Sequence, residues 1–167
     1  MKLTRYIKPA QIKLELDTKN PTEIPEGANP EKILWQVKES VLSELVELLD
    51  TSGKVVNSKK LYTDLVNRER RATTGIGGGI AIPHVRTMQA RSFSIAFARS
   101  TSGVDFGAID GKPVHLFICV VAPPYDDNLY LKVYKSIGEI FGREETRKQL
   151  LSAKDGHEIV KILSSFE

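Results

Sequence analysis

Residues 73–84 read TTGIGGGIAIPH, with four glycines between positions 75 and 79, then an apolar triplet, then Pro83 and His84. Glycine has no Cβ, so it adopts positive φ angles without steric cost and lets other groups approach the main chain closely. Successive exposed N–H groups in such a segment form a concavity that binds anions. The run therefore predicts either a phosphate-binding loop beside a histidine or a tight turn leading into a buried strand.

Two common nucleotide-binding motifs do not fit this run. A P-loop requires Lys and then Ser or Thr after its last glycine, whereas Ile80 follows Gly79. The dinucleotide pattern G-x-G-x-x-G requires a glycine where the chain has Ile80 or Ile82. Neither type of nucleotide site is predicted.

The histidine offers a different phosphate chemistry. Imidazole titrates near neutral pH, and its unprotonated nitrogen is a competent nucleophile toward phosphorus. Such a site also needs donors to the phosphoryl oxygens. The candidates are a nucleophile, a cation on the preceding helix, two hydroxyls and the glycine N–H groups: His84, Arg68, Thr73, Thr74, Gly75, Gly77, Gly78 and Gly79.

Helical and strand patterns alternate on either side of the run. Apolar residues recur at helical spacing in residues 29–50, 58–70, 126–141, 143–152 and 155–166, with Asn29, Ser58 and Asp155 as expected N-caps. Residues 92–99 alternate as a half-buried strand does, and residues 114–121 are almost wholly apolar, as in a central strand covered on both faces. Asp126 and Asp127 follow that strand, where they suit either a ligand site or helix caps. The pattern predicts a single α/β domain with a mixed central β-sheet flanked by helices.

The N-terminal part has a different character. Ile12, Leu14 and Leu16 alternate with charged residues as in a short strand, and a Pro-rich connector follows to residue 28. We therefore divide the chain into an N-terminal extension, residues 1–28, and the main domain, residues 29–167.

Composition excludes several other classes of protein. The chain has 167 residues and a net charge of +3, and this excess is too small to predict nucleic-acid binding, for which a clustered basic face is expected. Its one cysteine, Cys119, lies in an apolar run and suits a buried hydrophobe rather than a disulfide or catalytic thiol. The other histidines, His115 and His157, show no paired metal-ligand spacing, so no metal site is expected. No apolar run reaches the ~20 residues of a membrane span and no signal peptide is evident, which predicts a cytoplasmic protein.

Two blocks resemble the IIA components of the sugar phosphotransferase system, of the fructose/mannitol and nitrogen-regulatory type: RERRATTGIGGGIAIPH at 68–84 and VDFGAIDGKPV at 104–114. The resemblance implies that family's mixed sheet with flanking helices. It also implies that His84 accepts a phosphoryl group from a phosphocarrier protein of the HPr or NPr type, assisted by Arg68, without a cofactor. A IIB component or a regulatory target protein would then be the next partner.

The chain departs from this family pattern at the site itself. Tyr130 stands where the family typically has a second histidine that helps to hold the phosphoryl group, and Gly78 stands where it has asparagine. Tyrosine donates a hydrogen bond but does not become a cation. The departures favour a regulatory, nitrogen-regulatory-like member over a sugar-transport one. They leave open a non-enzymatic regulatory binding module of the same fold, in which phosphorylation is weakened or lost because Tyr130 replaces the second histidine.

Overall fold

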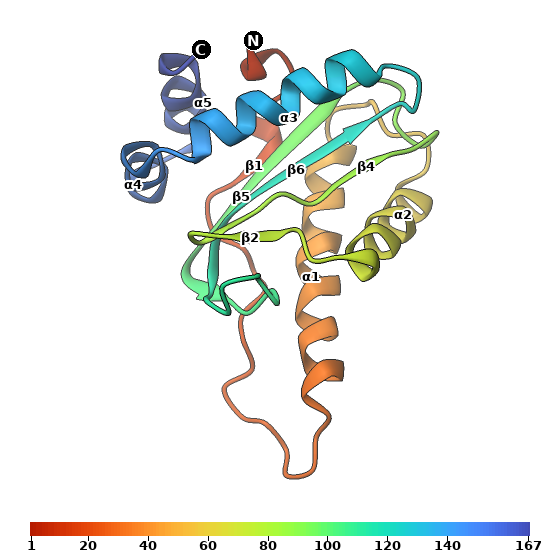
Figure 1. Cartoon of the computed structure of the whole chain (residues 1–167), viewed down its shortest axis with the longest axis vertical. Coiled ribbons are helices and arrows are strands. Elements are labelled where there is room, and N and C mark those ends of the chain that lie inside the picture. The colour runs from red at the N-terminus through yellow and green to blue at the C-terminus, as the bar shows by residue number, and fades with distance from the viewer.

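Three layers make up the computed structural model, which describes residues 1–167: a β-sheet lies between two groups of helices (Figure 1). The helices are η1 (Leu3–Arg5), η2 (Pro9–Gln11), α1 (Pro30–Asp50), α2 (Ser58–Arg71), α3 (Asp127–Phe141), α4 (Glu144–Ser152) and α5 (Gly156–Ser165). The strands are β1 (Ile12–Lys13), β2 (Gly75–Gly77), β3 (Ile80–Ala81), β4 (His84–Arg86), β5 (Ser94–Val104) and β6 (Val114–Ala122).

The six-stranded sheet is mixed, as the sequence pattern predicts. Its order is β1-β5-β6-β3-β2, and β4 pairs with β6 farther along the same edge as β3. Strands β5 and β6 are antiparallel, whereas β3 and β4 run parallel to β6 and β1 runs parallel to β5. The predicted α/β class with a mixed sheet flanked by helices is confirmed.

Strand β6 is central because side chains on both of its faces are buried. Phe117, Cys119 and Val121 belong to a core shared with α1 and α2. Leu116, Ile118 and Val120 belong to a second core shared with α3, α4 and α5. An uninterrupted apolar strand thus holds the two helical layers together.

The helix starts follow local capping chemistry. The side chain of Asn29 accepts hydrogen bonds from the N–H groups of Glu31 and Lys32 (3.0 and 3.4 Å), and Pro30 occupies the first turn. Asp155 caps α5 in the same way through Glu158 N. The expected cap at Ser58 is wrong by one residue, because Asn57 accepts from Lys60 N at 3.0 Å and Ser58 is already helical.

Strand β5 is longer than its alternating pattern predicts. The pattern ends near Arg99, but the strand continues to Val104, which pairs with Val114 after an irregularity in register. Gly103, with a φ of +82°, lies in this irregularity. A bulge adds residues to one strand of an antiparallel pair, so it breaks the alternation that sequence analysis relies on.

Residues before α1 contribute to both cores. Leu3 and Ile7 are buried with the α3–α5 layer, and Leu16 with the α1–α2 layer. The two ends of the chain lie close together in Figure 1, and Thr4 donates hydrogen bonds to the carboxylate of Glu167 through its N–H and its hydroxyl.

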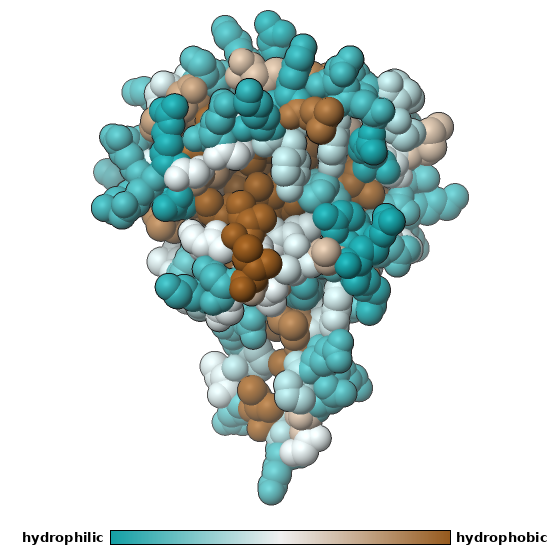
Figure 2. All heavy atoms as spheres, in the orientation of Figure 1, coloured by the Kyte–Doolittle hydropathy of each residue, from teal (hydrophilic) through white to brown (hydrophobic).

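Residues 17–29 and the first turns of α1 project as an arm with scattered hydrophobic patches (Figures 1 and 2). None of the helices is both long enough and apolar enough to span a bilayer.

Candidate functional site

His84 begins β4, at the edge of the sheet next to α2. Its main chain pairs with Val120 in β6, and Val120 N donates to the carbonyl of Pro83 at 2.9 Å. Proline restricts the backbone just before the histidine. The imidazole therefore projects from a main chain that is held by the central strand.

One hydrogen bond sets the tautomer of the His84 ring. Nδ1 lies 2.7 Å from the carbonyl oxygen of Ile82. A carbonyl oxygen only accepts, so Nδ1 carries the proton in the neutral ring and Nε2 keeps its lone pair. Nε2 lies 3.5 Å from Nη2 of Arg68, so it faces this guanidinium.

Burial lowers the pKa of His84 below its ordinary value of 6.5, and the charge of Arg68 also lowers it. The hydrogen bond to the Ile82 carbonyl and the charge of Glu69 act in the opposite direction, but the net shift of the pKa is downward. The neutral ring is therefore the form present at neutral pH. A ring with one fixed proton and one available lone pair is suited to nucleophilic attack.

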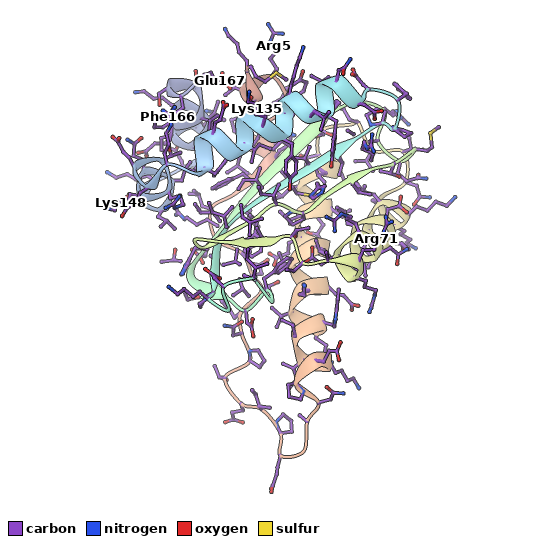
Figure 3. All side chains as sticks on the ribbon, in the orientation of Figure 1. Arg5, Arg71, Lys135, Lys148, Phe166 and Glu167 are labelled. Atoms are coloured by element: carbon purple, nitrogen blue, oxygen red, sulfur yellow. The ribbon has the colours of Figure 1, made fainter.

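Arginines surround the exposed side of the histidine. Arg68, in the last turn of α2, donates from Nη1 to the carbonyl of Ala72 at 3.0 Å, which orients its guanidinium toward His84. A depression of about 630 Å³ is lined by His84, Val85, Pro124, Asp127, Tyr130 and three arginines, Arg68, Arg71 and Arg86. Figure 3 labels Arg71 at the C-terminal end of α2, and Figure 2 shows hydrophilic atoms gathered over that end. Three guanidinium groups against one carboxylate give this depression a net positive charge, which favours anions over cations.

Two tyrosines of α3 cover the other side of the ring. The Tyr130 ring centroid lies 6.3 Å from that of His84, and the Tyr134 centroid lies 4.9 Å away in an edge-on arrangement. Burial raises the pKa of Tyr130 to about 12 and raises that of Tyr134 as well, so both hydroxyls stay protonated. Sequence analysis did not name Tyr134, although its i+4 spacing from Tyr130 places both on one helix face.

The structure does not bring the glycine turn to His84. Gly77, Gly78 and Gly79 all have positive φ angles and form the tight connection between β2 and β3. The Gly79 carbonyl accepts from the N–H groups of His115 and Leu116 at the start of β6, while His84 pairs with Val120. Leu116, which bonds to Gly79, and Val120, which pairs with His84, are four residues apart in β6, a distance of about 13 Å along the strand. Of the two expected functions of this run, the turn is the one that the geometry supports.

Gly75, Thr73 and Thr74 also have structural partners. A Cβ on Gly75 would lie 2.8 Å from the Ala108 Cα, so glycine permits close packing there. The Thr73 hydroxyl accepts a hydrogen bond from Gly75 N at 3.2 Å. The carbonyl of Thr74 accepts one from Ile82 N. Buried Thr74 donates to Glu69 from its N–H and its hydroxyl.

A buried ion pair lies between α1 and α2, next to the turn of α2 that carries Arg68, and the sequence did not predict it. Lys38 of α1 and Glu69 of α2 approach to 2.9 Å with side chains only 5% and 1% exposed. Glu69 also accepts both hydrogen bonds from Thr74 (3.0 and 2.5 Å). The pair therefore joins α1, the last turn of α2 that carries Arg68, and the segment leading into β2. The available signal was Lys38 itself, a charge on the apolar stripe of the first helix.

The remaining candidates lie elsewhere. His115 begins β6, where its Nδ1 lies 2.9 Å from the carbonyl of Ser100, and His157 lies in α5. Cys119 is fully buried in β6, which raises the pKa of its thiol. Asp126 caps α3 by accepting from Leu129 N, and Asp127 forms an ion pair with Arg86.

Comparison with known proteins shows the family. Residues 31–166 match the model of the family described as "Phosphoenolpyruvate-dependent sugar phosphotransferase system, EIIA 2", and the chain belongs to this family. It is 35% identical over 168 residues to the PTS system fructose-specific EIIABC component of Bacillus subtilis (strain 168), covering all of this chain but only 24% of that relative. It is 30% identical over 137 residues to the nitrogen regulatory protein of Pseudomonas aeruginosa, covering 82% of this chain and 84% of that protein.

Solved structures support the fold. Nitrogen regulatory protein IIA-Ntr from Neisseria meningitidis superposes with a TM-score of 0.79 at 24% identity, over 98% of this chain and 99% of that one. Enzyme IIAMTL of Escherichia coli, solved in complex with phosphorylated enzyme IIBMTL, superposes with a TM-score of 0.70 at 20% identity, over 95% of this chain and 97% of that one. At these identities the likeness concerns the fold alone.

Proposed function

We propose that the protein is a phosphohistidine carrier, in which Nε2 of His84 accepts a phosphoryl group from a phosphocarrier protein and passes it on. The observation that carries this proposal is the ring geometry: Nδ1 donates to the Ile82 carbonyl, and Nε2 is left facing Arg68 beside an arginine-lined depression. Membership of the EIIA 2 family agrees with a role of this type.

The transfer step follows from this geometry. The Nε2 lone pair of His84 attacks the phosphorus of the donor's phosphohistidine, and a new P–N bond forms. The P–N bond of the donor breaks, and its electron pair returns to the donor's imidazole nitrogen. The donor's ring carries a proton on its other nitrogen, so it leaves as a neutral imidazole. The proton on Nδ1 of His84 remains in the hydrogen bond to Ile82, so the phosphorylated His84 ring is an imidazolium and no base in this chain is required.

Arg68 and Tyr130 are the groups proposed to hold the phosphoryl oxygens. Arg68 supplies positive charge next to Nε2, and Tyr130 supplies a hydroxyl that remains a donor because its pKa is raised to about 12. The glycine turn is left out of this set because it lies about four residues along β6 from His84 and because Gly78 N donates to Asp110 Oδ2. Thr74 is left out because its N–H and its hydroxyl both donate to Glu69.

The test uses the purified protein with enzyme I, a phosphocarrier protein and labelled phosphoenolpyruvate. We expect acid-labile label on the wild-type chain and none on His84→Ala, with both proteins giving the same circular dichroism spectrum. Unlabelled wild-type protein, in a mixture that labels its own phosphocarrier, would refute the proposal.

A regulatory use of the phosphoryl group is proposed over sugar transport. One relative is named a nitrogen regulatory protein and another a fructose-specific component, so the relatives' names do not decide between the two. Tyr130 favours regulation, because its neutral hydroxyl stabilises a dianionic phosphoryl group less than a cationic residue would. Rapid transfer from the phosphorylated protein to a fructose-type IIB protein would instead indicate transport.

The second candidate function is a binding module of the same fold that acts on a partner without being phosphorylated. Tyr130 is again the observation that favours it, because the ring and its neighbour Tyr134 cover one side of His84. The labelling experiment separates the two candidates, since only a carrier acquires label on His84.

A further inference from the structure

Arg86 shares one face of β4 with His84. The two residues stand at i and i+2 in the strand, so both side chains project to the same side, about 6.6 Å apart at Cα. Val85, between them, packs against the opposite core with α1 and α2. The Arg86 guanidinium carbon lies 5.2 Å from the Tyr130 ring centroid and lines the same depression as His84. Arg86 therefore lies next to both His84 and Tyr130.

The resting partner of Arg86 is Asp127, in the first turn of α3. The two side chains form an ion pair while remaining 42% and 69% exposed. Exposed pairs of this kind contribute little to stability, so Arg86 can exchange its partner readily. A guanidinium has five N–H donors, of which one carboxylate engages at most two.

We propose that Arg86 is a second phosphoryl-binding residue, which Asp127 holds beside His84 until a phosphoryl group competes for the guanidinium. This inference rests on the proposed function of His84. A phosphoryl group carries nearly two negative charges and three acceptor oxygens, so it outcompetes one exposed carboxylate for the same donors. Arg86 then supplies, next to Tyr130, the positive charge that the tyrosine lacks. Asp127 is the resting partner that competes with the phosphoryl group for this guanidinium.

The experiment compares four single variants: Arg86→Gln, the conservative Arg86→Lys, Asp127→Asn, and the control Arg70→Gln, which makes the same substitution as Arg86→Gln at another arginine. Arg70 has a similar exposure to Arg86 but pairs with Glu39 and stacks on Trp35, on the other side of α2 from the depression. We expect Arg86→Gln to slow labelling by the phosphocarrier protein on the order of 10²-fold, as for loss of one electrostatic donor. Arg86→Lys should recover part of the rate, and Arg70→Gln should match the wild type.

Asp127→Asn distinguishes a carboxylate that competes for Arg86 from one that only holds the structure, because the two roles predict different changes in phosphate binding. Removing the competing carboxylate should tighten the binding of inorganic phosphate, followed by NMR shifts of the arginine side chains, whereas loss of a structural contact would weaken it or leave it unchanged. In the wild type, the Arg86 side-chain signal should move when phosphate is added.

The outcomes distinguish this inference from the proposed function. If the wild type is labelled while Arg86→Gln and Arg70→Gln react at equal rates, Arg86 is not a phosphoryl ligand and only this inference fails. If the wild type is not labelled, the proposed function fails. The phosphate titration then still shows whether Arg86 binds an anion, and Arg86 signals that do not change on adding phosphate would refute the inference about Arg86.

Discussion

Replacing Lys38 by Met tests the buried ion pair beneath the site. The substitution keeps an unbranched side chain only one atom shorter, but it leaves the Glu69 carboxylate without its counter-charge, and the Glu69 side chain is 1% exposed. Removing one partner of a buried pair costs about 3–5 kcal/mol. Because Glu69 keeps its two hydrogen bonds from Thr74, we place the loss at the lower end, about 3 kcal/mol.

Urea denaturation measures this loss. With an m-value of about 2 kcal/mol/M, a loss of about 3 kcal/mol lowers the unfolding midpoint by about 1.5 M. The matched control is Glu39→Gln, which breaks the exposed pair of Glu39 and Arg70 between the same two helices. Exposed pairs contribute about 0–1 kcal/mol, so the control should shift the midpoint by under about 0.5 M.

A second substitution determines whether charge is the cause. Adding Glu69→Gln to Lys38→Met should restore part of the lost stability, because a neutral amide needs no counter-charge and its oxygen still accepts from Thr74. Two results would refute the reasoning: a Lys38→Met shift no larger than that of Glu39→Gln, or a double variant that loses the sum of the two single losses.

Three further predictions concern the site and the core. Arg68→Ala should slow phosphoryl transfer to His84 on the order of 10²-fold in the labelling assay, and an unchanged rate would remove Arg68 from the site. Burial lowers the pKa of His84 in the folded protein, so at pH values between that pKa and 6.5 the unfolded chain binds a proton that the folded chain does not. The contribution of His84 to the free energy of unfolding is therefore constant above pH 6.5 and falls as the pH decreases through this window. Urea midpoints from pH 7.5 to 5 should therefore fall less in His84→Ala than in the wild type, and equal slopes would contradict the assignment. Cys119, whose pKa is raised by complete burial, should react with a thiol reagent at pH 8 only after unfolding in urea, and rapid labelling of the native protein would contradict its burial.

Local chemistry made the helices and the central strand predictable. Asn29 and Asp155 cap helices as expected, because an N-cap depends only on a side chain and on N–H groups two or three residues away. The predicted central strand at 114–121 is confirmed within one residue. The far end of β5 was not predictable from alternation, since the bulge near Gly103 is specified by pairing with a distant strand.

The site was predictable only in part. The motif singled out His84 and Arg68, and the resemblance added Tyr130; the structure brings all three together. Tyr134 and the Lys38–Glu69 pair were not identified, because their contacts depend on how helices far apart in the sequence pack. Arg86 was not identified because its significance depends on the direction of β4 and on the proximity of Asp127, 41 residues later in the chain.

The sequence alone determined the family and the layered class of fold and singled out His84 as the candidate site histidine, because short motifs and helical or strand periodicity are local properties of the chain. Only the tertiary structure decided what the glycines do. Their positive φ angles and the close approach of Ala108 explain a tight hairpin about four residues along β6 from His84. The arginine-lined surroundings of His84 come instead from the end of α2, from β4 and from α3, which strand pairing and packing bring together.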